Sequence, residues 1–202
     1  MAYTEREKLT EVLLKSDRPS EYFEQLREEN RLKEYYLPLE DLVGIEQNPK
    51  YHPEGDVWVH TMMVIDTAAT LRDKAENPLG FMLAALCHDL GKKVSTTVEP
   101  DGRIRSIGHE KTGVPIGRAM LKKLGFDFKL IDYAMNIVYY HMKPNNYAAQ
   151  NSSQKAFNKV FSQCVSPDDL LLMAESDRMG RVSSYDETRE FLREKLENFR
   201  NN

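Results

Sequence analysis

Apolar residues recur along most of this chain at spacings of three and four positions, the periodicity of amphipathic helices. The pattern therefore predicts a series of helices and an all-α fold. The expected helices cover residues 3–15, 21–34, 57–72, 79–90, 112–124, 128–141, 154–164, 167–175 and 185–199. Gly91 and Gly125 follow two of them, where glycine commonly ends a helix.

Two stretches depart from the helical pattern. The segment VSTTVEPDGRIRSIG has two β-type runs around Pro100-Asp101-Gly102, which predicts a small hairpin near residues 94–107. Residues 34–56, rich in proline and glycine, are expected to form an irregular connection. We therefore expect one domain over residues 1–202, in which residues 1–50 form an N-terminal helical extension packed on the rest.

The composition fits a soluble cytoplasmic domain. A chain of 202 residues with 41% hydrophobic content can bury a core without disulfides, and its two cysteines, Cys87 and Cys164, are expected to be reduced thiols. The start of the chain is charged, and no stretch approaches the roughly 18 apolar residues of a membrane span. The oligomeric state stays open, because the apolar stripe of helix 185–199 could close the core or pair with a second subunit. Core closure is the expected outcome.

The net charge of -4 argues against bulk affinity for nucleic acid or for anionic membranes. The charge is unevenly distributed, because ten lysines and arginines but only five acidic residues lie between Lys92 and Lys143. A basic middle in an acidic protein favours a small anionic substrate over extended nucleic acid, although any one of these lysines is expected to lie on a solvated helix face.

Several histidines face the interior of the expected fold. His60, His88 and His141 each have apolar residues three or four positions away on their helices, which turns the imidazoles inward. Asp89 follows His88, and Asp177 ends another apolar helix. Buried carboxylates are costly unless they are paired or bind a cation. His and Asp without cysteine suit Mn, Fe, Co, Ni or Mg better than a structural zinc.

These residues carry a family resemblance. The order His60, His88-Asp89, Asp177, with the sequence HDLGK, resembles the HD superfamily of metal-dependent phosphohydrolases. With His109 and His141 the pattern resembles the H, HD, H, H, D signature that accompanies a two-metal centre. The blocks QNPKYHPEGDVWVHTMMVID, ALCHDLGK, DGRIRSIGHEKTG, YYHMKP and SDRMGR resemble the HD domain of bacterial CCA-adding tRNA nucleotidyltransferases. Because 202 residues leave no room for a nucleotidyltransferase domain, we expect a stand-alone HD domain.

The resemblance implies a ligand set for two divalent ions. The first ion would be held by His60, His88, Asp89 and Asp177. The second would be held by His109 and His141, with Asp89 bridging the two ions.

Further roles follow for charged neighbours of these ligands. We expect Asp89, Lys92 and Glu110 to be catalytic, with Glu110 as an acid/base or a partner of the metal ligands, and Lys92, Arg178 and Arg181 to bind the substrate. The alternatives are a solvated helix charge for Lys92, an exposed side chain for Glu110 and an ion pair between Asp177 and Arg181.

The predicted function is metal-dependent hydrolysis of nucleotide-type phosphomonoesters or 2',3'-cyclic phosphodiesters through a metal-bound hydroxide. The resemblance leaves two alternatives open. The same six ligands hold di-iron in a few HD oxygenases, and a non-catalytic nucleotide-binding module could keep the fold. No ligand of the signature is missing here, which favours an enzyme.

Overall fold

The computed structural model describes residues 3–179 and 186–201. Helices make up most of the described chain, and its strands form one two-stranded hairpin, which confirms the all-α prediction. The helices are α1 (Glu5–Lys15), α2 (Ser20–Glu28), α3 (Leu32–Glu40), α4 (Val57–Leu71), α5 (Pro78–Cys87), α6 (Lys92–Ser95), α7 (His109–Lys123), α8 (Phe128–Tyr140), α9 (Met142–Ala149), α10 (Gln154–Phe161), α11 (Pro167–Met179) and α12 (Asp186–Arg200), with a 3-10 turn η1 (Arg72–Lys74) after α4. The hairpin pairs β1 (Thr96–Val98) with β2 (Ile104–Ser106) in antiparallel fashion.

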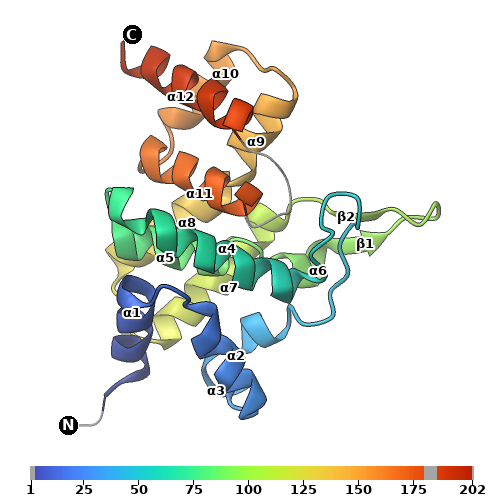
Figure 1. The fold of residues 1–202 in the computed structure, drawn as a ribbon, viewed down its shortest axis with the longest axis vertical. Coiled ribbons are helices and arrows are strands. Elements are labelled where there is room, and N and C mark those ends of the chain that lie inside the picture. Colours follow the sequence, from blue (N-terminus) through green and yellow to red (C-terminus); the bar gives the residue numbers. More distant parts are fainter. Residues whose placement is uncertain (1–2, 180–185, 202) are drawn as a thin grey trace.

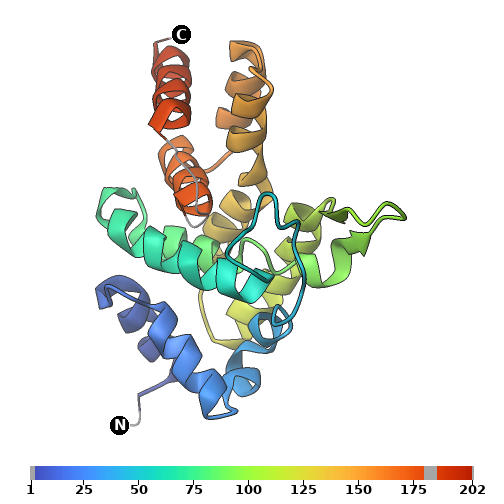
Figure 2. The same ribbon diagram turned by 45° about the vertical axis from the view of Figure 1, so that its right-hand side comes forward.

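The helices form an elongated body with the two termini at opposite ends (Figure 1). Helices α1 to α3 lie at one end, α9, α10 and α12 at the other, and α4 and α5 cross the middle. The hairpin projects from one side of this middle region, as both views show (Figure 2). Among the described residues, no helix combines the length and the apolar character needed to cross a membrane.

Helix α5 is the centre of the core. Its sequence, PLGFMLAALC, is apolar throughout, and every residue from Gly80 to Cys87 is buried, as expected for a helix surrounded by others. Asn77 caps its start by accepting a hydrogen bond from the Gly80 N–H. The helix packs against α4 and α8, so its C-terminal end delivers His88 and Asp89 to the middle of the protein.

The N-terminal helices share this core, to which α1, α2 and α3 contribute Leu9, Phe23 and Tyr36. The expected helix over residues 21–34 is divided, because α2 ends at Glu28 and Asn30 adopts a left-handed conformation with φ of 56°. Helix α3 then occupies part of the segment expected to be irregular. It is kinked at Tyr36 and contains a proline, which explains why its pattern does not read as a helix.

Two other helices differ from the expectation. Helix α9 occupies the polar stretch after His141, where the apolar periodicity is weak, and the short α6 precedes β1. The strands are consequently shorter than the β-type runs that predicted them, although they lie within the expected residues 94–107.

The two glycines expected to end helices behave differently. Gly125 has a φ of +86° and ends α7 as expected. Gly91 instead has a helical φ of -71°, so the prediction that it terminates a helix in the manner of Gly125 is wrong. A Cβ atom on Gly91 would lie 2.1 Å from the carbonyl oxygen of His109. The absence of a side chain at residue 91 therefore allows the start of α7 to approach the turn that carries Asp89.

The C-terminal helix closes a second, smaller apolar cluster. Leu192 and Leu196 of α12 are buried against Phe157 and Phe161 of α10. The expected core closure by this helix is confirmed, while its expected first residue, Tyr185, lies outside the described residues.

Candidate metal centre

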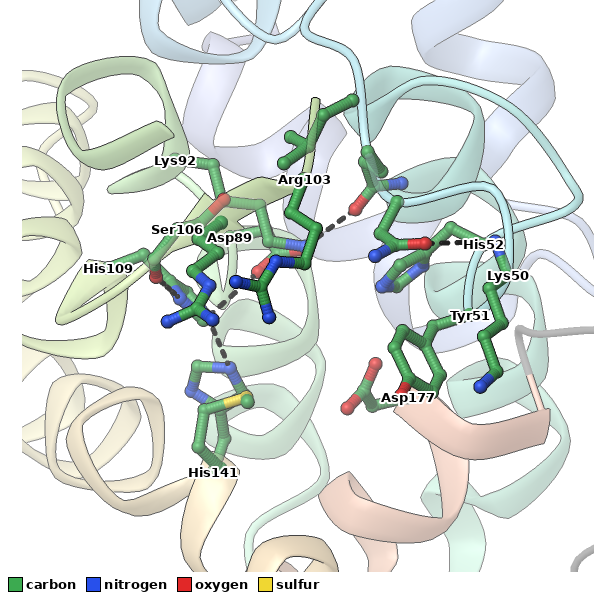
Figure 3. A pocket seen from close by; sticks show the side chains of 15 residues that line it. Lys50, Tyr51, His52, Asp89, Lys92, Arg103, Ser106, His109, His141 and Asp177 are labelled. Carbon is green, nitrogen blue, oxygen red and sulfur yellow. Dashed lines mark hydrogen bonds and ion pairs between the residues drawn. The ribbon is translucent and has the colours of Figure 1, made fainter. Parts of the chain in front are cut away.

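The structure brings the six predicted ligands together from five places in the fold. His60 lies on α4, His88 and Asp89 lie in the turn after α5, and His109 begins α7. His141 follows α8, and Asp177 lies near the end of α11. All six side chains are buried. Figure 3 shows Asp89, His109 and His141 on one side of a cavity and Asp177 on the other.

Asp89 stands between two groups of ligand atoms. Its Oδ2 lies 3.2 Å from His88 Nε2 and 3.7 Å from His60 Nε2. Its Oδ1 lies 3.2 Å from His109 Nε2. The two oxygens of one carboxylate thus face different imidazoles, which is the arrangement that a bridging ligand requires.

Three of the imidazoles are oriented by their own chain segments. His88 Nδ1 lies 2.8 Å from the carbonyl oxygen of Ala85, and the corresponding Nδ1–O distances are 2.7 Å for His109 with Ser106 and 2.6 Å for His141 with Val138. In each case the carbonyl belongs to the residue three positions earlier. Because a carbonyl only accepts, Nδ1 must carry the proton, and Nε2 of the neutral ring keeps its lone pair for another partner.

These lone pairs face one another in a way that a cation would stabilise. His109 Nε2 lies 3.3 Å from His141 Nε2, and two unprotonated nitrogens at this distance repel. His88 Nε2 is buried without a hydrogen-bond partner among the described residues, and its neighbour Asp89 Oδ2 is also an acceptor. Separations of 3.1 to 3.7 Å match the ~3 Å between adjacent ligand atoms when metal–ligand bonds are about 2.1 Å. The donor set therefore fits divalent ions.

The charges of the centre are strongly coupled. Burial raises the pKa of Asp89, but the nearby His88 imidazole, the ammonium group of Lys92 and the contact with His109 lower it more, so the pKa lies well below its usual range. Burial lowers the pKa of His141 to about 3, which keeps this imidazole neutral. Burial also lowers the pKa of His60, but hydrogen bonding to Asp177 and contact with Glu54 raise it more. The centre thus presents ionised carboxylates together with at least one neutral imidazole, the forms that bind metals.

The other predicted site residues occupy different positions. Lys92 is buried, and its Nζ lies 2.8 Å from Asp89 Oδ2 and 2.6 Å from Gln47 Oε1. Glu110 is half-buried in the first turn of α7 and does not line the cavity. Arg178 is half-buried on α11 and also does not line it, and Arg181 lies outside the described residues.

Residues from the loop before α4 support His60. Glu54 Oε1 lies 2.9 Å from His60 Nδ1 and 2.8 Å from His52 Nδ1, and the His52 ring packs edge-on against the His60 ring. Asp56 caps α4 by accepting a hydrogen bond from the Val59 N–H. The sequence motif YHPEGD contains Glu54, but helical periodicity assigns no direction to a side chain in a loop.

A cavity of about 600 Å³ opens onto the centre, within the usual range for small-molecule sites. Asp89, His109, His141 and Asp177 line it together with four basic side chains. These basic residues are Lys50, Lys92, Arg103 and Arg105. Figure 3 shows Arg103 extending from the hairpin toward Asp89, with Tyr51 across the cavity. Arg103 and Arg105 are site residues that the sequence did not single out, because only folding brings the hairpin over the centre.

The fold and the buried His/Asp cluster define a class of protein. The HD domain model matches residues 57–178, and the chain belongs to the HD domain family, a superfamily of metal-dependent hydrolases. The chain is also similar to curated proteins called "Multifunctional CCA protein". It is 34% identical to the one from Actinobacillus pleuropneumoniae serotype 5b over 191 residues, which cover 93% of this chain and 45% of that relative. It is 34% identical to the one from Ralstonia nicotianae over 171 residues, which cover 82% and 38%.

A further relative of the same name, from Methylobacillus flagellatus, is 39% identical over 131 residues, which cover 64% of this chain and 30% of that relative. The chain thus spans less than half the length of these curated relatives. The expected resemblance to the HD part of CCA proteins is confirmed.

Proposed function

We propose that this protein is a metal-dependent phosphohydrolase that acts on nucleotide-type phosphomonoesters or 2',3'-cyclic phosphodiesters. The observation that carries the proposal is the convergence of four imidazoles with the carboxylates of Asp89 and Asp177 at the floor of an open, basic cavity. His60, His88, Asp89 and Asp177 would hold one divalent ion, and His109, His141 and Asp89 a second. When bound, such ions neutralise phosphoryl oxygens and lower the pKa of an attacking water.

The side chains of the cavity supply the remaining requirements of ester hydrolysis. The attacking water forms a bond to phosphorus, the ester P–O bond breaks, and the departing oxygen takes up a proton. Lys92 already shares its ammonium group with Asp89, so it can contact a phosphoryl oxygen without leaving the centre. Arg103, Arg105 and Lys50 attract the anionic substrate toward the same floor. For Glu110, a catalytic role stays a prediction that no contact yet supports.

The choice of nucleotide substrates is supported by the relatives and by the cavity. The relatives called "Multifunctional CCA protein" are 34% identical to this chain over 93% and 82% of its length. The exposed ring of Tyr51 lines the cavity beside the basic residues and could stack on a base, which pairs an aromatic face with phosphate-binding groups. Small phosphorylated compounds fit the cavity volume better than an extended nucleic acid does.

The decisive experiment compares metal content and turnover in one preparation. Metals are measured in the purified protein and removed by chelation. Product formation from 2',3'-cyclic AMP, 2'-AMP, 3'-AMP and 5'-AMP is then followed with added Mn, Ni, Co or Mg. We expect hydrolysis that needs metal and is lost in His88→Ala. Bound iron with oxygen consumption but no hydrolysis would instead support the di-iron oxygenase, and nucleotide binding without metal or turnover would support a binding module.

The hairpin arginines should govern substrate capture more than turnover. In Arg103→Ala/Arg105→Ala, we expect KM for the hydrolysed nucleotide to rise about tenfold with little change in kcat, because these cations raise the local substrate concentration. The effect should weaken as ionic strength increases. Steady-state kinetics at low and high salt measure both. Arg118→Ala is the matched control, since Arg118 pairs with Asp132 outside the cavity. An equal KM in the double variant and the wild type would contradict this role.

A further inference from the structure

Nδ1 of His60 contacts a different kind of group from the one that Nδ1 of the other three metal-facing imidazoles contacts. Nδ1 of His88, His109 and His141 points at a neutral backbone carbonyl. His60 Nδ1 instead lies 2.9 Å from a carboxylate oxygen of Glu54. A carboxylate attracts the Nδ1 proton more strongly than a carbonyl does, and it makes Nε2 a more basic ligand.

Glu54 is held in place from two sides. The same oxygen, Oε1, contacts both His60 and His52, and only 1% of the Glu54 side chain is exposed. The carboxylate next to His60, a group that is ordinarily ionised at neutral pH, is therefore held in one position by contacts on two sides.

This charge makes the two ends of the centre unequal. At one end, Asp177 Oδ1 lies 3.1 Å from His60 Nε2 and Glu54 lies behind the same ring. At the other end, His109 and His141 face each other beside the carboxylate of Asp89, and their Nδ1 atoms lie against backbone carbonyls. Of the contacts described for the four imidazoles, a carboxylate behind the ring is found at the His60 end alone.

We propose that Glu54 is a positioning residue that makes the His60 end the high-affinity ion position, so that the two ions bind unequally and the ion at the His109–His141 end is the exchangeable one. The inference rests on the proposed two-ion centre, but not on its hydrolytic activity. Ion binding, measured without substrate, can therefore test it separately.

The test is a Mn²⁺ titration of the chelator-treated full chain, with free Mn²⁺ followed by electron paramagnetic resonance. For the wild type we expect two classes of ion that differ in affinity by about tenfold or more. Glu54→Gln has the same shape but no charge, and it should weaken the tight class by about 10- to 100-fold while leaving the weak class unchanged. Glu46→Gln is the matched control, because Glu46 is an exposed glutamate of the same loop.

A second readout distinguishes positioning from a general loss of structure. In the Co²⁺-loaded protein, the exchangeable imidazole Nδ1–H protons give shifted proton resonances. Glu54→Gln should move the one resonance that belongs to His60 and leave the three carbonyl-bonded protons in place. Equal affinities in Glu54→Gln and the wild type, or equal weakening of both classes, would overturn the inference. A wild-type protein that binds no ion would overturn the proposed function as well.

Discussion

Replacement of Asp89 by asparagine should reduce metal-dependent hydrolysis by about 10³-fold or more, because bound ions contribute several kcal/mol of transition-state stabilisation. Asparagine has nearly the same volume, but its NH₂ group cannot accept, so one side of the bridge is lost. Asp89 faces His88 and His60 through one oxygen and His109 through the other. Both ion positions should therefore be affected.

The measurements for Asp89→Asn are kcat/KM and the number of metal ions per chain after dialysis. Asp132→Asn is the control, since Asp132 forms a surface ion pair with Arg118, and such pairs contribute little. A variant that keeps more than a tenth of the wild-type kcat/KM would contradict the bridging role of Asp89.

Replacement of Gly91 by alanine should destabilise the protein by about 3 kcal/mol or more, at the upper end of overpacking effects. The new Cβ would lie 2.1 Å from the His109 carbonyl oxygen and 2.6 Å from the Gly113 nitrogen, and neither backbone atom can turn aside. The start of α7 would have to move away from α6. Urea unfolding monitored by circular dichroism measures the free energy of unfolding.

Gly102→Ala provides the control for this glycine. Gly102 has a φ of +80° at the hairpin tip and open space around it, so alanine there should cost only about 1 kcal/mol of backbone strain. If Gly91→Ala were no less stable than Gly102→Ala, the close approach would not be important for the fold. Gly91→Ala should also weaken ion binding at the His109–His141 end, because His109 lies at the contact.

Much of this site could be predicted from sequence because its residues lie on regular helices. Inward-facing His60 and His141 follow from 3.6-residue periodicity, and the central apolar run locates His88 and Asp89 at its end. Only the family resemblance identifies His109 as a ligand. The apolar pattern predicts that its helix begins at residue 112, whereas α7 begins at His109.

The residues that sequence reasoning missed lie in loops and at edges. Glu54 is in a proline- and glycine-rich segment, where periodicity gives no side-chain direction. Arg103 and Arg105 approach the centre only because the hairpin folds over it. The sequence predicts that Gly91 ends a helix. Its close approach to the start of α7 is a tertiary contact, which a local sequence pattern cannot predict.

The three carbonyl-bound imidazoles also determine when the centre acquires its shape. His88, His109 and His141 each bond to a carbonyl three residues earlier, so their ring orientations are set within single turns of the chain. Side-chain freedom is then lost during folding, and little remains to be lost when an ion arrives. The chelated protein should consequently stay folded with its ligands in place, and ion uptake should be a fast exchange step rather than a folding event.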